Sequence, residues 1–157
     1  MKLLLFVCLL AFNSSASSDR PAAFEPFDGN WRGTFQVFSA EGELLTELGV
    51  EQSYRWEGNV QVADFREVDT DGNVTTAKAK NFRNEAGELI CRVEKSTGDV
   101  TEHVGRVTDG NLFWYGPNEC FREEVVTING VPSYTIDGFG TYGDTTLLFK
   151  GRYQRVE

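Results

Sequence analysis

The sequence predicts an all-β domain closed into an antiparallel up-and-down barrel of about 8 to 10 strands. Turn signals built from Gly, Asn and Asp recur along the chain at intervals of roughly ten residues. The segments between them are rich in Val, Thr, Phe, Tyr and Trp, and several alternate apolar and polar residues. No long segment has a helical period. A meander of so many strands would expose two edges unless the sheet closed on itself.

The first residues form a predicted targeting signal. A positive start at Met1-Lys2 precedes the apolar run Leu3 to Phe12 and a small, polar cleavage region that ends at Ser18. We therefore expect a signal peptide over 1–18, a flexible lead-in over 19–26 and the barrel over 27–157. The apolar run is shorter than the ~20 residues that cross a bilayer. The sequence thus predicts export to a secreted or periplasmic location, with no membrane span.

The composition limits the class of partner. The chain has 157 residues, which fits one domain, and a formal net charge of −9. An acidic surface repels phosphate, so we expect no nucleic-acid partner. No pattern in the sequence indicates an oligomeric state.

Three segments show the alternation most clearly. Residues 31–37, 44–56 and 147–155 each carry mostly apolar residues at every second position. A period of two with polar residues between predicts that one face of each strand lies in the core and the other in water. The inward rows also contain glycines, which we expect to leave room inside the barrel: Gly33, Gly105, Gly138 and Gly140.

The middle segments are less regular. Asp64 and Arg66 share a face with valines over 60–68, and Lys78 and Lys80 do so over 74–82. These charges lie either outside the barrel or in a wet interior. A barrel of about ten strands has room for such an interior, whereas about eight strands leave one that side chains fill or one small ligand occupies.

One motif resembles a known superfamily. Phe27-Asp-Gly29-Asn-Trp31 is similar to the start of the barrel in lipocalins and fatty-acid-binding proteins, the calycins. The resemblance implies that Trp31, with Gly29, plugs the closed end of the barrel. It also implies that a basic residue of the last strand, Arg152 or Arg155, packs across that plug.

The chain departs from the two best-known branches of that superfamily. Only a short turn lies over 39–43, so neither the helical lid of fatty-acid-binding proteins nor the long loop of lipocalins is expected. Fatty-acid-binding proteins hold the ligand carboxylate with an Arg-x-Tyr pair, and here the order is reversed as Tyr153-Gln-Arg155. Both side chains still share a face, so an anionic head group remains one interpretation.

The resemblance implies that the barrel binds a small apolar or amphipathic molecule. The inward rows give the candidate contacts, which are Tyr54, Trp56, Phe149, Tyr153 and Arg155. Core packing of the aromatic residues, and pairing of the arginine with an acid or an aromatic face, are the competing interpretations. No cofactor is expected. Two alternatives stay open: a structural or protein-interaction barrel filled by its own side chains, and a haem- or bilin-handling calycin.

Catalysis and metal binding find no support in the sequence. His103 is the single histidine, and no cysteine or acid stands at the usual ligand spacing from it. A nucleophile elbow of the form Gly-x-Ser-x-Gly is absent. We therefore expect neither catalytic nor metal-binding residues and predict that the protein is not an enzyme. A surface position with a hydrogen bond is the expectation for His103.

Two cysteines follow the predicted cleavage site, Cys91 and Cys120. An oxidising compartment favours one disulfide between them. Two-residue turns at Thr97-Gly98 and Asp109-Gly110 would instead separate them beyond the ~7 Å that a disulfide allows between Cα atoms. A chain that doubles back near Gly116 would change this register. A disulfide and two free thiols therefore both remain open.

Overall fold

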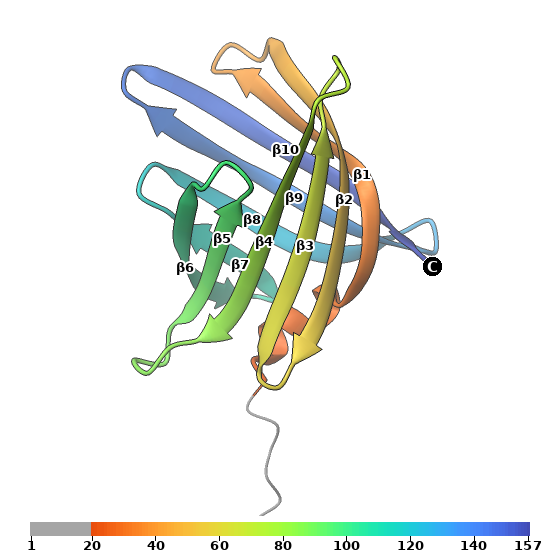
Figure 1. Cartoon of the computed structure of the whole chain (residues 1–157), viewed down its shortest axis with the longest axis vertical. Coiled ribbons are helices and arrows are strands. Elements are labelled where there is room, and N and C mark those ends of the chain that lie inside the picture. Colours follow the sequence, from red (N-terminus) through yellow and green to blue (C-terminus); the bar gives the residue numbers. More distant parts are fainter. Residues whose placement is uncertain (1–19) are drawn as a thin grey trace, which may run out of the picture.

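Ten antiparallel strands close into a barrel in the computed structural model, which describes residues 20–157 (Figure 1). Each strand pairs with its neighbours in sequence, and β1 pairs with β10 to complete the ring. The strands are β1 (Gly29–Ser39), β2 (Leu44–Glu57), β3 (Val60–Val68), β4 (Val74–Arg83), β5 (Leu89–Lys95), β6 (Val100–Thr108), β7 (Asn111–Tyr115), β8 (Glu119–Ile128), β9 (Val131–Tyr142) and β10 (Thr145–Val156). The predicted fold class is confirmed.

The tight turns follow from local backbone preference. Asp109 and Gly110 have φ angles of 51° and 79°, and Asn129 and Gly130 have 52° and 80°. Two successive positive φ values define the hairpin turn whose twist matches that of the flanking strands, and Asp-Gly and Asn-Gly adopt it readily. These pairs therefore connect β6 to β7 and β8 to β9 directly.

Alternation separates the core from the surface. Trp31, Val50, Tyr54 and Tyr153 are buried on the predicted inward faces of β1, β2 and β10. The charges of the middle strands lie outside: Lys78 is exposed, for example. The opposite faces of β3 and β4 contribute buried residues, Ala63 and Ala79.

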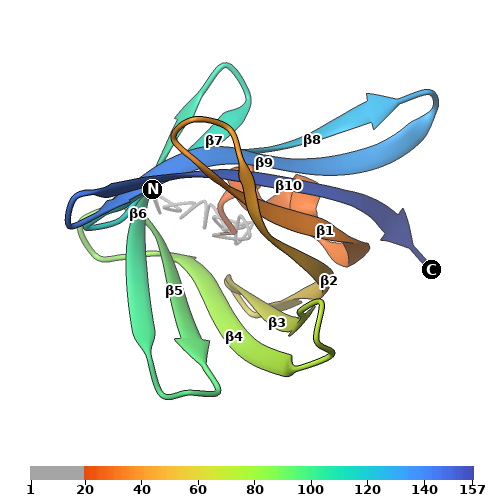
Figure 2. The same ribbon diagram turned by 90° about the horizontal axis from the view of Figure 1, so that it is seen from above.

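A short helix closes one end of the barrel. Residues Ala22–Phe27 form the 3-10 helix η1, whose Phe24 is 0% exposed and stacks on Trp114 at 6.0 Å between ring centroids. The amide of Gln61 donates to the Phe24 carbonyl at 2.8 Å. Residues 19–26 were predicted to be a flexible lead-in; the structure places Ala22 onward in this helix, with Phe24 buried. Figure 2 shows the strands encircling the interior, and Figure 1 shows the short helix at the lower end of the barrel.

Trp31 forms the plug above this helix. It is 1% exposed, and its indole N–H donates to the Phe27 carbonyl at 2.7 Å. The Arg155 guanidinium lies over the indole ring at 4.6 Å from its centroid. Gly29 has a φ of 111°, and an added Cβ would lie 3.1 Å from the Arg155 side chain. Trp31 is therefore buried at the η1 end of the barrel, and the basic residue across its ring is Arg155.

No helix among residues 20–157 is long and apolar enough to cross a membrane. The predicted signal peptide over 1–18 lies outside the described residues.

Candidate functional site

The interior of the barrel contains a cavity of about 350 Å³ between the plug and the opposite end. We call that opposite end the mouth; it carries the β1–β2, β3–β4, β5–β6, β7–β8 and β9–β10 turns. The volume is at the lower end of the range for small-molecule sites. Its lining mixes apolar and polar residues, among them Phe35, Leu48, Phe65, Ala77, Ala79, Val93, Phe121, Ile136 and Phe149 with Gln52, Glu67, Lys95, His103, Glu119 and Glu123.

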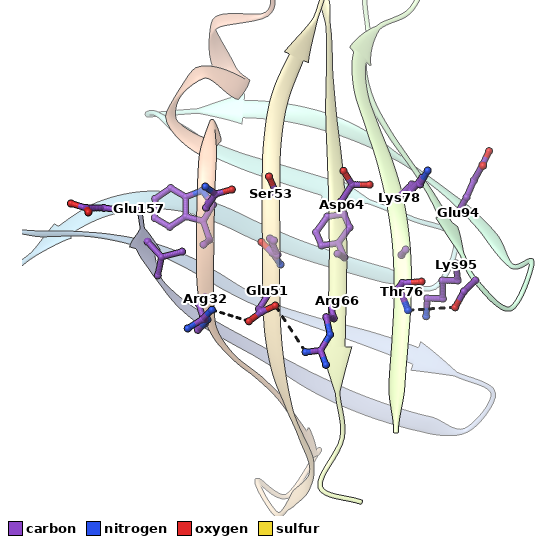
Figure 3. Close-up of a pocket in the computed structure, with 17 residues that line it drawn as sticks. Arg32, Glu51, Ser53, Asp64, Arg66, Thr76, Lys78, Glu94, Lys95 and Glu157 are labelled. Atoms are coloured by element: carbon purple, nitrogen blue, oxygen red, sulfur yellow. Dashed lines mark hydrogen bonds and ion pairs between the residues drawn. The ribbon is translucent and has the colours of Figure 1, made fainter. Parts of the chain in front are cut away.

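A larger groove of about 790 Å³ is lined mostly by the outer face of β1 to β5. Figure 3 shows its charged side chains on neighbouring strands. Arg32 pairs with Glu51 at 3.0 Å, and Arg66 approaches the same carboxylate at 4.0 Å. These charged side chains pair with one another on the surface. The cavity inside the barrel is therefore the better candidate site.

A hydrogen-bonded network lies at the plugged end of the cavity. Glu123 of β8 accepts from the Tyr134 hydroxyl at 2.7 Å and from the Trp114 indole N–H at 2.9 Å. The Tyr134 hydroxyl also lies 3.4 Å from that of Tyr54, and the Tyr134 ring packs against Tyr153 at 5.1 Å between centroids. Burial raises the pKa of the Glu123 carboxyl and the pKa values of all three tyrosines.

A second network lies nearer the mouth. His103 Nε2 is 2.6 Å from Glu119 Oε1, and the Tyr142 hydroxyl donates to Glu119 Oε2 at 2.5 Å. The hydrogen bond with His103 lowers the pKa of Glu119. Burial, followed by the bond to Glu119, raises the pKa of Tyr142 to about 12. The network fixes the Glu119 carboxylate as an ion beside the cavity.

His103 differs from its predicted surface position. The residue is 4% exposed and lines the cavity. Its Nδ1 has no hydrogen-bond partner, so a ring protonated only on Nε2 leaves no buried donor unpaired. With Nε2 held by Glu119 and Nδ1 covered, neither ring nitrogen is free to act as an axial haem ligand. Residues 20–157 also contain no group of three or more His, Cys, Asp or Glu placed to hold a metal ion.

The structure divides the predicted ligand contacts into two groups. Tyr54, Phe149 and Tyr153 line the cavity. Trp56 and Arg155 do not, which corrects their assignment. Arg155 is held at the plugged end by Trp31, and the Trp56 ring lies 5.0 Å below the Arg20 guanidinium at the same end.

The inward glycines do not create the cavity, contrary to the expectation for Gly33, Gly105, Gly138 and Gly140. Large neighbours take the space instead: a Cβ on Gly105 would lie 2.8 Å from the Trp114 ring, and one on Gly138 would lie 2.4 Å from Phe121. Small side chains on β4, Ala77 and Ala79, line the open volume.

Sequence reasoning missed the interior acids. Glu123 follows Phe121 at the inward spacing of two, but Arg122 and Glu124 give the outward face the same charged character. Alternation is therefore hidden in this part of β8. The one available signal was the pair of bulky apolar residues, Phe121 and Val125, on either side of Glu123 in that row.

Both cysteines are free. Cys91 faces the cavity on β5, whereas Cys120 lies between Tyr115 and Phe139 on the opposite face of the sheet. Three strand spacings of ~4.8 Å separate β5 from β8, or about 14 Å, which is beyond disulfide reach. Of the two alternatives, the structure therefore shows two free thiols.

The thiols should differ in reactivity in the folded protein. Burial raises the pKa of the Cys91 thiol far above its usual value and that of Cys120 to a smaller extent. A maleimide should therefore label Cys120 about tenfold faster or more than Cys91, and both should react in denaturant. Mass spectrometry with Cys120→Ser as the control measures this. Fast labelling that persists in Cys120→Ser would contradict the assigned orientations.

No family model matches the sequence, and no curated protein matches it. Solved structures do show likeness to this chain. The S-type phycobiliprotein lyase CPES of Guillardia theta has a TM-score of 0.48 at 11% identity, covering 85% of this chain and 90% of that one. A designed fluorescence-activating β-barrel has a TM-score of 0.44 at 14% identity, covering 85% of this chain and 97% of that one. Lobster apocrustacyanin A1 gives 0.40 at 16%, covering 84% of this chain and 62% of that one.

These structural similarities are distant. The fold assignment therefore rests on the strand topology and the plug of this chain. Ten antiparallel strands joined only to their sequence neighbours close into one ring. A tryptophan of the first strand and an arginine of the last strand meet at its plugged end. The fold is therefore a closed, lipocalin-like up-and-down barrel, and its candidate site is the cavity in its interior.

Proposed function

We propose that the protein is an exported, non-enzymatic carrier that binds a small, mostly apolar or amphipathic molecule inside its barrel. The observation that carries this proposal is the interior cavity of about 350 Å³. A barrel that served only as a rigid scaffold would gain stability from a filled interior, because packing is favourable and voids are costly. Export is supported by the N-terminal sequence alone.

The apolar part of the ligand would lie among the aliphatic and aromatic residues toward the mouth. Phe35 of β1 and Phe149 of β10 stack there at 5.9 Å between ring centroids, and Leu48 lines the same region. The polar groups near the plug would orient the ligand, since a few placed polar groups in an apolar pocket provide specificity. We expect no nucleic acid as a partner.

A matched pair of substitutions on β4 tests the location of binding. Ala77 lines the cavity and Thr76 faces the outer groove, so the same ring can be placed on either side of one strand. Ala77→Phe should lower the affinity for the neutral dye N-phenyl-1-naphthylamine about tenfold or more, because the ring occupies the cavity. Thr76→Phe should leave this affinity within about threefold of the original.

Dye fluorescence measures the affinity, and circular dichroism verifies that both variants are folded. An original protein that binds neither this dye nor any other apolar probe would refute the carrier proposal. A larger loss in Thr76→Phe than in Ala77→Phe would move the binding site to the outer groove.

A further inference from the structure

Glu123 is an interior acid whose hydrogen-bond donors are all neutral. Both of its carboxylate oxygens accept hydrogen bonds from neutral donors, the Tyr134 hydroxyl and the Trp114 indole. The side chain is partly buried, and it lines the cavity. No lysine or arginine of residues 20–157 lies within ion-pair distance of it.

The basic groups inside the barrel are already engaged elsewhere. Lys95 lies near the mouth, where burial raises the pKa of Glu67 and the charge of Lys95 offsets part of that rise. Its charge also adds to the lowering of the Glu119 pKa by the hydrogen bond with His103. His103 is bonded to Glu119 through Nε2. The cavity thus has three carboxylates facing it and one lysine, and its deepest acid lacks a counter-charge.

A buried acid without a counter-charge is costly to the folded protein. Taking a carboxylate out of water is unfavourable unless a cation or several donors replace the water. Two neutral donors replace part of it here. Such uncompensated groups cluster at functional sites, where the missing partner comes from the ligand.

Aromatic residues surround the same position. Tyr54, Tyr153 and Trp114 line the cavity beside Glu123, and Tyr134 bonds to it. Aromatic faces attract cations through their quadrupole, most strongly where water is excluded. A site that combines a carboxylate with aromatic rings favours binding of an ammonium group and disfavours binding of a second carboxylate.

We propose that the ligand carries a positively charged nitrogen that Glu123 binds at the inner end of the cavity. This inference rests on the proposed function, that a small molecule occupies the interior. It replaces the anionic head group considered from the sequence, because Arg155 is committed to Trp31 at the plug. The ligand is then an amphipathic amine, with its apolar part directed toward the mouth.

Three probes with the same ring test the charge. Isothermal titration at neutral pH compares 1-naphthylmethylamine, 1-naphthylmethanol and 1-naphthylacetate. The amine should bind about tenfold tighter or more than the alcohol and the acetate, since bonds to charged groups are the stronger ones. Glu123→Gln should remove this preference. Glu124→Gln is the matched control, because Glu124 is the next residue of β8 and pairs with Arg122 on the outer face.

Each outcome has a distinct meaning. Alcohol or acetate binding as tightly as the amine would overturn the cationic ligand and leave interior binding intact. A preference for the amine that survives in Glu123→Gln, or disappears in Glu124→Gln, would overturn the role of Glu123. Failure of all three probes and of the neutral dye would refute the proposed function itself.

Discussion

Replacing Trp31 with Ala is expected to lower the free energy of unfolding by about 3–5 kcal/mol. The side chain is almost wholly enclosed and meets Tyr134 edge-on at 5.6 Å between ring centroids. Its loss would leave a cavity beneath the Arg155 guanidinium and an unpaired carbonyl at Phe27. The plug thus contributes more than its apolar area, since it connects η1, β1 and β10.

Urea unfolding followed by circular dichroism measures this loss. Trp56→Ala is the matched control, because Trp56 is only partly buried and its ring meets Arg20 at the surface. The control should lose about 1–2 kcal/mol. Equal losses in the two variants would contradict the assignment of Trp31 as the plug.

Replacing Glu123 with Gln is expected to stabilise the ligand-free protein at neutral pH by about 0.5–2 kcal/mol. Burial raises the pKa of Glu123 in the folded state above its ordinary value of 4.5. Its ionised form is therefore disfavoured by folding. A glutamine can still accept from Trp114 and donate to Tyr134, so the network keeps its hydrogen bonds.

The pH dependence follows from the sign of that shift. Below the unfolded pKa, Glu123 is protonated in both states and costs nothing. As pH rises through the raised folded pKa, the original protein loses stability that Glu123→Gln retains. The difference in unfolding free energy between Glu123→Gln and the original protein should thus be near zero around pH 4 and grow toward neutral pH. Other titratable groups facing the cavity are common to both proteins: Tyr54, Glu67, Cys91, Lys95, His103, Glu119, Tyr134, Tyr142 and Tyr153.

Thermal unfolding across this pH range is the measurement, with Glu124→Gln as the control. That variant removes an outward carboxylate paired with Arg122, so it should show no such gain at neutral pH. A Glu123→Gln protein that is less stable than the original at neutral pH would show that the carboxylate stabilises the empty barrel. A gain in stability in Glu123→Gln is the expected result if Glu123 serves ligand binding at a cost to the stability of the empty barrel.

Register explains why the cysteine prediction stayed open. Two-residue turns would have placed Cys91 opposite Val104, but it pairs with His103. The β5–β6 turn holds three residues, because the Lys95 N–H bonds to the Asp99 carbonyl. The chain also doubles back at Gly116, which pairs Tyr115 with Cys120. One extra residue in a turn shifts every later pairing, and no local pattern reveals it.

The sequence by itself determined the strands and the turns. Side-chain direction alternates along any strand, and Asp109-Gly110 adopts its turn through its own backbone preferences, so both can be read locally. Only the tertiary structure decided which polar groups meet inside. Glu123 lacks an ion-pair partner only because none of the other nine strands places a lysine or arginine beside it. Arg155 contacts Trp31 only because β1 and β10 pair to close the barrel. Such contacts join residues far apart in the chain, and their energies depend on burial that the folded barrel alone creates.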